Sequence, residues 1–303
     1  MAKTVLLFPG QGAQAVGMGN NLTQRSSKAK SLFDQASEIL GYDLLALCTQ
    51  GPESQLNATS HSQPALFVHA MAALADLSEQ KPEVVSGAIA VAGLSLGEYS
   101  AACAAGAITF EDGVKLVHER GTAMQAAAES SPSGMASVLG LDFEKVTELC
   151  NQARQPGEIL QVANLLCPGN IAISGHVASL DAASQVAEQM GAMKFIRLSV
   201  AGAFHTDLML PAKERLAQAI AATPMQACRI PLISNVDAQP HTAASDLQAL
   251  FPKQLVSPVR WEDSLRHLIA MGAEQFYEIG AGRVLAGTLK RIDRKAACES
   301  YGD

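Results

Sequence analysis

The sequence predicts an α/β fold in which a short parallel sheet covered by helices is interrupted by a small inserted unit. Over residues 1–130 and 200–303, short apolar runs alternate with segments of helical periodicity, which is typical of a parallel sheet with helices on both faces. Residues 131–199 instead follow the order β-α-β-β-α-β of a ferredoxin-like unit. We therefore expect a core made of 1–130 and 200–303, and an insert at 131–199.

Two apolar runs in the first part of the core end at glycine-rich turns. Residues 4–8 precede PGQG and residues 88–92 precede GLSLG, so both are expected to be buried strands. Pro64 suits the first turn of a helix, and Thr109 with Asp112 can form a capping box. The expected helices are 27–40, 64–78, 98–105 and 111–128.

The insert and the last part of the core follow the same logic. In the insert we expect strands at 135–139, 159–164, 170–174 and 194–198, and helices at 143–153 and 179–190. The core then continues with helices at 209–222, 261–271 and 283–292 and strands at 232–236 and 275–279. The core sheet should therefore have four strands.

Composition excludes several classes of protein. The net charge is −7 and no dense Lys/Arg block is present, which argues against a nucleic-acid partner. The N-terminal run MAKTVLLFPGQG is too short for a signal peptide or a membrane span. The six cysteines form no C-x-x-C pair, and the seven histidines show no metal-ligand spacing. We expect a soluble cytoplasmic enzyme with no metal.

Ser95 lies between Gly93 and Gly97, where an expected strand ends and an expected helix begins. A strand-to-helix turn this tight needs small neighbours, because a Cβ on either side would collide with the adjoining elements. The turn exposes Oγ at the carboxyl end of a parallel strand and directs the following N–H groups toward the atom that Oγ would attack. Ser95 is therefore the candidate nucleophile, although a glycine-rich structural turn would show the same pattern.

A serine needs a base, and His205 is the best-placed histidine. It lies in SVAGAFHTD, where the chain leaves the insert, so it can face Ser95 across the crevice between the two units. An ordinary loop histidine remains the alternative for His205. The other six have simpler interpretations, three within helical patterns and three beside turns or helix starts: His69, His118 and His267, and His61, His176 and His241.

Six stretches together resemble malonyl-CoA:acyl carrier protein transacylases, the acyltransferases of fatty acid synthesis, over nearly the whole chain. In order they are LFPGQGAQ, GLSLGEYSA, ERGTAMQ, GAFHTDLM, PKQLVSPVRW and EIGAGRVLAGTLKRI. The family fold is a hydrolase-like core with a ferredoxin-like insert, which agrees with the pattern above. The resemblance implies a malonyltransferase in which malonyl is carried as an ester of Ser95.

The resemblance also implies the roles of the neighbouring residues. His205 would take the Oγ proton and later activate the incoming thiol. The main-chain carbonyl of Gln254 would orient His205, in place of a carboxylate. The backbone N–H groups of Gln11 and Leu96 would hold the oxyanion.

The resemblance further implies that Arg120 and Phe204 determine which acyl group is accepted. A malonyl group brings a carboxylate into the site, and a buried charge without a partner is costly, so a guanidinium that grips both oxygens is suited to the task. Arg120 lies in the matching RG-x-x-MQ stretch; without the resemblance it would be taken for a solvated helix residue. Phe204 precedes the histidine, and in related acyltransferases a bulky residue there leaves no room for a 2-methyl group.

One position departs from the family, because Leu94 stands where many members have histidine before the serine. The departure bears on rate and thioester preference rather than on reaction class. Coenzyme A and phosphopantetheine would be substrates, so no bound cofactor is expected, and the family implies a monomer. An acidic carrier protein would need a local basic patch on this acidic chain; the candidates are Lys290, Arg291, Arg294 and Lys295, or Lys194 and Arg197.

Three other functions fit parts of the pattern. A serine hydrolase, such as a thioesterase or esterase, could use Asp237 with His241 or His267 in the chain order Ser, Asp, His. A docking protein could keep the fold without catalysis. A free-standing acyltransferase serving a polyketide synthase would have the same chemistry and the same substrate.

Overall fold

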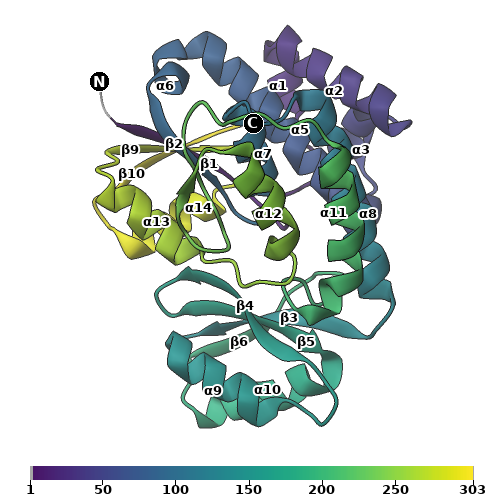
Figure 1. Cartoon of the computed structure of the whole chain (residues 1–303), viewed down its shortest axis with the longest axis vertical. Coiled ribbons are helices and arrows are strands. Elements are labelled where there is room, and N and C mark those ends of the chain that lie inside the picture. The colour runs from purple at the N-terminus through teal and green to yellow at the C-terminus, as the bar shows by residue number, and fades with distance from the viewer. Residues whose placement is uncertain (1–2, 303) are drawn as a thin grey trace.

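The computed structural model describes residues 3–302, which form two sheets with their helices (Figure 1). The larger sheet has six strands in the order β10-β9-β1-β2-β7-β8, and the smaller has four in the order β4-β5-β3-β6. Strands β1, β2, β7, β9 and β10 are parallel to their neighbours, and only β8 pairs antiparallel, with β7. The α/β fold expected from the sequence is confirmed.

The central strands of the larger sheet are buried on both faces. Alternate residues of β1 contribute to two separate apolar clusters: Leu6 and Phe8 face one, Val5 and Leu7 the other. The larger sheet comprises β1 (Thr4–Phe8), β2 (Ala88–Gly93), β7 (Leu232–Ile233), β8 (Pro240–His241), β9 (Gln275–Ile279) and β10 (Ala297–Tyr301).

Helices cover both faces of this sheet. One face is covered by α13 (Trp261–Ala270) and α14 (Val284–Ile292), whose apolar residues join the cluster containing Val5 and Leu7. The helices that contribute to the other cluster are α1 (Asn20–Arg25), α2 (Ser27–Leu40), α3 (Leu44–Gln50), α4 (Glu53–Leu56), α5 (Thr59–Gln80), α6 (Pro82–Ser86), α7 (Gly97–Ala104), α8 (Phe110–Glu129), α11 (Leu210–Ala222) and α12 (Ala244–Gln254).

The smaller sheet has the strand order and antiparallel pairing of a ferredoxin-like unit. Its outer face packs against two helices and encloses an apolar cluster of its own (Figure 1). The elements in chain order are β3 (Ser133–Leu139), α9 (Phe143–Ala153), β4 (Leu160–Cys167), β5 (Asn170–His176), α10 (Val177–Gln189) and β6 (Lys194–Arg197).

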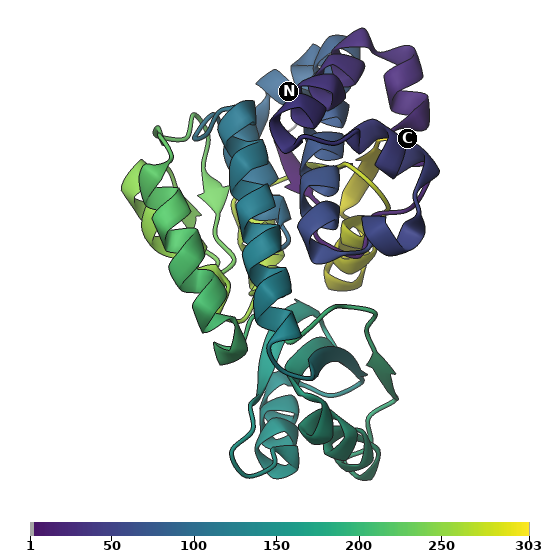
Figure 2. The ribbon, with the colours of Figure 1, turned by 90° about the vertical axis from the view of Figure 1, so that its right-hand side faces the viewer.

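The long helix α8 leads from the larger unit into the smaller one, and α11 returns beside it (Figure 2). Thr109 caps α8 by accepting a hydrogen bond from the N–H of Asp112 at 3.1 Å, as predicted. Between β6 and α11, the chain recrosses to the larger unit through the segment that holds His205 and the 3₁₀ turn Asp207–Met209. The site therefore lies where the two units meet.

Several predicted elements differ from the structure. The prediction that a helix starts at Pro64 is wrong, because α5 already begins at Thr59 and Pro64 lies in its second turn. Residues around Pro64 are buried on all sides, so packing outweighs the missing N–H bond. The four-stranded core sheet was also an underestimate, since the patterns of β8 and β10 are too short or too polar to stand out. The strand expected at 232–236 ends at Ile233, where a hairpin turn begins.

No helix within residues 3–302 is both long enough and apolar enough to span a bilayer.

Candidate active site

Ser95 lies at the turn between β2 and α7, with φ of 52° in the left-handed region, a strained conformation for a residue with a Cβ. A Cβ on Gly93 would lie 1.9 Å from the carbonyl carbon of Gly97, and a Cβ on Gly97 would lie 2.1 Å from the carbonyl oxygen of Phe8. Both glycines are therefore required by the close approach of backbone to backbone. The sharp turn that the sequence predicted is present.

Asn235, which the sequence analysis did not single out, holds this turn in place. Its Oδ1 accepts a hydrogen bond from the N–H of Ser95 at 2.7 Å, and its Nδ2 donates to the carbonyl of Gly93 at 2.8 Å. Asn235 follows β7, the strand next to β2, so the carboxyl ends of two parallel strands meet here. The sequence analysis placed Asn235 inside the strand expected at 232–236, so its position just after the strand was not recognised.

His205 faces Ser95, with its Nε2 2.8 Å from the Ser95 Oγ. Its Nδ1 lies 2.8 Å from the main-chain oxygen of Gln254. Because a carbonyl oxygen only accepts hydrogen bonds, Nδ1 carries the proton and Nε2 accepts from the Ser95 hydroxyl. Three groups that the resemblance implied as partners thus lie in one hydrogen-bonded chain, although their catalytic roles remain predictions.

The surroundings of His205 favour its neutral form. The side chain is buried, and its backbone has φ of 61°. Burial, together with the positive charge of Arg120, lowers the pKa of His205 to about 4. At neutral pH the imidazole is therefore unprotonated at Nε2, the form that can take a proton from serine.

Arg120 is fully inside the fold, 1% exposed, and its guanidinium lies beside the nucleophile. Nη2 donates to Ser95 Oγ at 3.1 Å and to Gln254 Oε1 at 2.9 Å, and Nη1 donates to Gln63 Oε1 at 2.8 Å. The guanidinium carbon also lies 5.4 Å from the centre of the Tyr99 ring. Arg120 is thus not the solvated helix residue that its sequence context alone suggested.

Glu98 is a second buried charge in the site that the sequence analysis missed. Its Oε1 accepts from the N–H of Asn235 at 3.1 Å, and its Oε2 accepts from Gln254 Nε2. Burial raises the pKa of Glu98 to about 7, against the opposing effects of these hydrogen bonds and of Arg120. Burial likewise lowers the pKa of Arg120, opposed by Tyr99 and Glu98.

Leu96 directly follows the nucleophile in the chain, and Gln11 lies in the N-terminal loop. The N-terminal loop packs directly on the turn, since a Cβ on Gly10 would lie 2.4 Å from the carbonyl oxygen of Leu94. Within residues 3–302, neither the Gln11 N–H nor the Leu96 N–H donates a hydrogen bond to the protein. Both groups could serve as an oxyanion hole, as expected from the resemblance.

Phe204 and Leu94 are both buried at the edge of the site. Phe204 directly precedes His205 and joins the apolar cluster on the α5 side of the sheet. Leu94 joins the cluster on the α13 side, next to Ser95 in the chain. Their influence on substrate choice remains a prediction.

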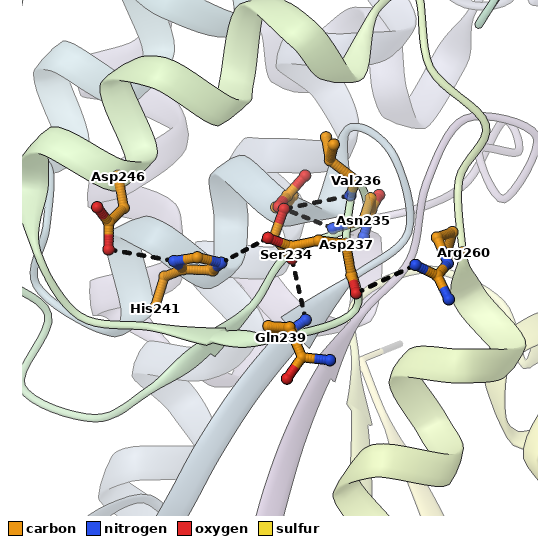
Figure 3. A network of polar contacts seen from close by, with 9 residues as sticks. Ser234, Asn235, Val236, Asp237, Gln239, His241, Asp246 and Arg260 are labelled. Carbon is orange, nitrogen blue, oxygen red and sulfur yellow. Dashed lines mark hydrogen bonds and ion pairs between the residues drawn. The ribbon is translucent and has the colours of Figure 1, made fainter.

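Figure 3 shows the alternative pair, Asp237 and His241, among polar contacts that also include Ser234, Asn235 and Asp246. Nε2 of His241 lies 3.0 Å from Asp237 Oδ2, and Nδ1 lies 3.1 Å from Asp246 Oδ2. Desolvation lowers the pKa of His241, but the two carboxylates outweigh it and raise the pKa overall. Because both ring nitrogens face carboxylates, His241 is not placed to act as a base for Ser95, whose hydroxyl bonds to His205 instead.

Residues of both units line the space beside His205. A cavity of about 250 Å³ is lined by His205 and Val256 from the larger unit and by residues of the insert that include Arg154 and Gln161. A second cavity, of about 650 Å³, shares Phe143 and Pro258 with it and lies between β4, β5 and the start of α13. The insert therefore forms one wall of the cavity beside His205.

The two candidate basic patches lie on different units. Lys290 and Arg294 line a cavity of about 550 Å³ beside α14, together with Arg283. Arg291 points elsewhere and donates to the carbonyl of Pro168 in the insert at 3.2 Å. On the insert, Lys194 and Arg197 lie on β6, and Arg197 pairs with Asp181. Lys295 follows α14.

Among residues 3–302, no group of three or more His, Cys, Asp or Glu side chains is arranged to hold a metal ion.

Comparison with known proteins gives consistent results. Residues 5–300 match the acyl transferase domain family. The chain is 41% identical over 305 residues to a malonyl CoA-acyl carrier protein transacylase of Bacillus subtilis, covering 100% of this chain and 94% of that protein. A Staphylococcus aureus protein of the same name is 39% identical over 294 residues, covering 97% of this chain and 94% of that protein.

Solved structures of proteins with the same kind of name are also similar to this chain. The malonyl CoA-acyl carrier protein transacylase of Coxiella burnetii superposes with a TM-score of 0.94 at 37% identity, over 99% of this chain and 93% of that one. A malonyl-transacylase in complex with a type II PKS acyl-carrier protein superposes with a TM-score of 0.95 at 34% identity, over 100% of this chain and 96% of that one.

Proposed function

Because this chain belongs to the acyl transferase domain family, we propose that it transfers a malonyl group from malonyl-CoA to the phosphopantetheine thiol of an acyl carrier protein. The relatives that cover nearly all of the chain are malonyl CoA-acyl carrier protein transacylases. The single observation that carries the proposal is the placement of the Arg120 guanidinium 3.1 Å from the Ser95 hydroxyl, which in turn lies 2.8 Å from His205.

In the first half-reaction, Ser95 Oγ attacks the thioester carbonyl while His205 Nε2 takes the hydroxyl proton. The hydrogen bond from Arg120 draws electron density toward Oγ and favours loss of this proton. The N–H groups of Gln11 and Leu96 hold the oxyanion of the tetrahedral intermediate. The C–S bond then breaks, and the coenzyme A sulfur leaves with the proton from His205.

The second half-reaction reverses these roles. His205 takes the proton of the phosphopantetheine thiol, and the thiolate attacks the carbonyl of malonyl-Ser95. The C–O bond breaks and Oγ recovers the proton from His205. Both thiols are substrates, so the proposed cycle needs no bound cofactor.

Arg120 explains why a carboxylated acyl group is accepted. A malonyl carboxylate buried without a partner would cost several kcal/mol, and the guanidinium provides that partner inside the fold. A hydrolase of simple esters has no such need. A role in supplying a polyketide synthase is a second candidate, because one structural neighbour was solved with a type II PKS acyl-carrier protein. The chemistry at Ser95 would be the same in either pathway, and we propose that it takes place in the cytoplasm.

Mass spectrometry of the intact protein mixed with malonyl-CoA, acetyl-CoA and methylmalonyl-CoA tests this proposal. We expect a malonyl adduct on the wild type and none on Ser95→Ala. Arg120→Ala should lose the preference for malonyl over acetyl while it still forms some acyl-serine. Rapid loss of the adduct to water without carrier protein would favour a hydrolase instead.

A further inference from the structure

We propose that Glu98 is a positioning residue for malonyl selection: its buried carboxylate holds the Gln254 side-chain amide so that the amide oxygen anchors Arg120. This inference rests on the proposed function, because it concerns the residue that would bind the malonyl carboxylate. Glu98 itself does not line the path of the reacting atoms, and it acts through Gln254.

The contacts of Gln254 define the orientation of its amide. Nε2 donates to Glu98 Oε2 and to the main-chain carbonyl of Ser95, the latter at 2.9 Å. Oε1 consequently points the other way and accepts from Arg120 Nη2 at 2.9 Å. Gln254 is 1% exposed, so water does not replace any of these partners. The main-chain oxygen of the same residue receives the Nδ1 proton of His205.

The carboxylate of Glu98 is what makes this orientation the favourable one. Both of its oxygens face N–H donors, the main-chain N–H of Asn235 at 3.1 Å and the Nε2 of Gln254. The ionised form, which predominates above the pKa of about 7, only accepts hydrogen bonds, so it fixes which end of the Gln254 amide faces it. Glu98 also follows the nucleophile turn on α7, and it therefore ties that turn to the loop after β7 and to the end of α12.

A glutamine at position 98 cannot satisfy the same partners. Its oxygen would face the main-chain N–H of Asn235, which cannot turn away, and its NH₂ would face Gln254. If Gln254 then rotated its amide, its NH₂ would point at the Arg120 guanidinium and its oxygen at the carbonyl of Ser95. Either arrangement sets donor against donor in a buried place, and such mismatches are costly.

The experiment measures the preference for malonyl over acetyl, as the ratio of kcat/KM for the two CoA thioesters, in Glu98→Gln. We expect this ratio to fall about ten- to a hundredfold, mainly through slower malonyl transfer, because the guanidinium is no longer held beside Ser95. An unchanged ratio in a folded Glu98→Gln protein overturns the proposal.

Glu278→Gln is the matched control. Glu278 is also a fully buried glutamate whose oxygens accept two main-chain N–H groups, those of Leu285 and Ala286 at the start of α14. We expect Glu278→Gln to lower the melting temperature without changing the malonyl-to-acetyl ratio. If its ratio falls as much as that of Glu98→Gln, the effect is one of stability and the proposal is wrong.

Gln254→Leu keeps the proposal testable if Glu98→Gln does not fold. This variant removes the amide but keeps the main-chain carbonyl that faces His205. We expect a similar fall in the malonyl-to-acetyl ratio, and Glu98→Gln should add little to it in the double variant. A Gln254→Leu protein with the wild-type malonyl-to-acetyl ratio overturns the proposal. A double variant whose loss equals the sum of the two single losses, expressed as free energies, overturns it as well. Failure of the wild type to form malonyl-Ser95 would instead overturn the proposed function.

Discussion

His205, Arg120 and Glu98 show how burial determines the properties of single residues. None is more than 3% exposed, and each is held by polar partners inside the protein. Water cannot compensate if one partner is removed, so the loss falls on the group left behind. We therefore expect conservative substitutions here to change acyl transfer more than they change the overall fold.

The low pKa of His205 makes the stability of the protein depend on pH in a definite direction. The residue has a pKa of about 4 in the folded state, against about 6.5 in an unfolded chain, so the unfolded state binds more protons between these values. The free energy of unfolding should fall by roughly 3 kcal/mol from this residue as the pH falls from about 6.5 to about 4. Denaturant titrations of wild type and His205→Asn measure the effect, and an equal pH slope in both would contradict it.

Phe204 provides a second prediction for a single residue. Phe204→Ala should let the enzyme accept methylmalonyl-CoA about tenfold more readily, because the removed ring leaves room for a methyl group. The cavity in the core should also lower the free energy of unfolding by about 3 kcal/mol. Competition between malonyl-CoA and methylmalonyl-CoA, followed by mass spectrometry, measures the preference. Phe195→Ala in the insert is the control and should leave the preference unchanged.

Among the secondary-structure elements, the junction of β2 and α7 depends most on close packing. Its glycines are not interchangeable with alanine, because a Cβ on Gly97 would lie 2.1 Å from the Phe8 carbonyl on the neighbouring strand β1. Helix α7 could move away from the Phe8 carbonyl only if Ser95, which lies just before it in the chain, moved as well. The geometry of the nucleophile is thus tied to the pairing of β1 with β2.

Gly97→Ala should therefore slow acylation strongly. We expect the rate of malonyl-Ser95 formation to drop by at least about a hundredfold, since a displacement near 1 Å is enough for such a loss. Gly287→Ala is the matched control, because a Cβ there meets nothing within 4 Å and the position is helical. That variant should keep full activity and gain about 0.5–1 kcal/mol of stability. Normal acylation by Gly97→Ala would show that the turn tolerates a side chain.

At the scale of the whole molecule, the candidate active site lies where the two units meet. Arg120 reaches it from α8, which continues into the insert, and His205 reaches it from the segment that leaves the insert (Figure 2). Ser95 belongs to the parallel sheet of the larger unit. All three residues therefore belong to the larger unit, at its junction with the insert.

The net charge of −7 makes a local basic surface necessary if the carrier protein is acidic. Lys290 and Arg294 line the same cavity, and we expect the double variant Lys290→Glu/Arg294→Glu to raise the KM for the carrier about tenfold at low salt. Acylation of Ser95 by malonyl-CoA should not change. Lys194→Glu on the insert tests the other candidate patch, and a rise in KM for that variant alone would place docking there.

Local patterns in the sequence were sufficient for much of the fold. Helices α2 and α9 and strand β9 have the predicted bounds, and the strand order of the insert follows from the β-α-β-β-α-β pattern. Helical periodicity, caps and apolar runs act between residues that are close in the chain, so they can be recognised without coordinates. The turn at Ser95 belongs to the same class, because its glycines are its immediate neighbours.

Only the tertiary structure decided which polar groups surround the serine. Asn235 lies 140 residues from Ser95 in the chain, and Gln63 lies 57 residues from Arg120. A buried glutamate on a short helix or an asparagine after a strand has no local pattern that distinguishes it from a solvated one. The strand β10 and the position of Pro64 inside α5 also depend on packing against distant segments. Long-range contacts hold these groups in place, and therefore the sequence alone could not reveal them.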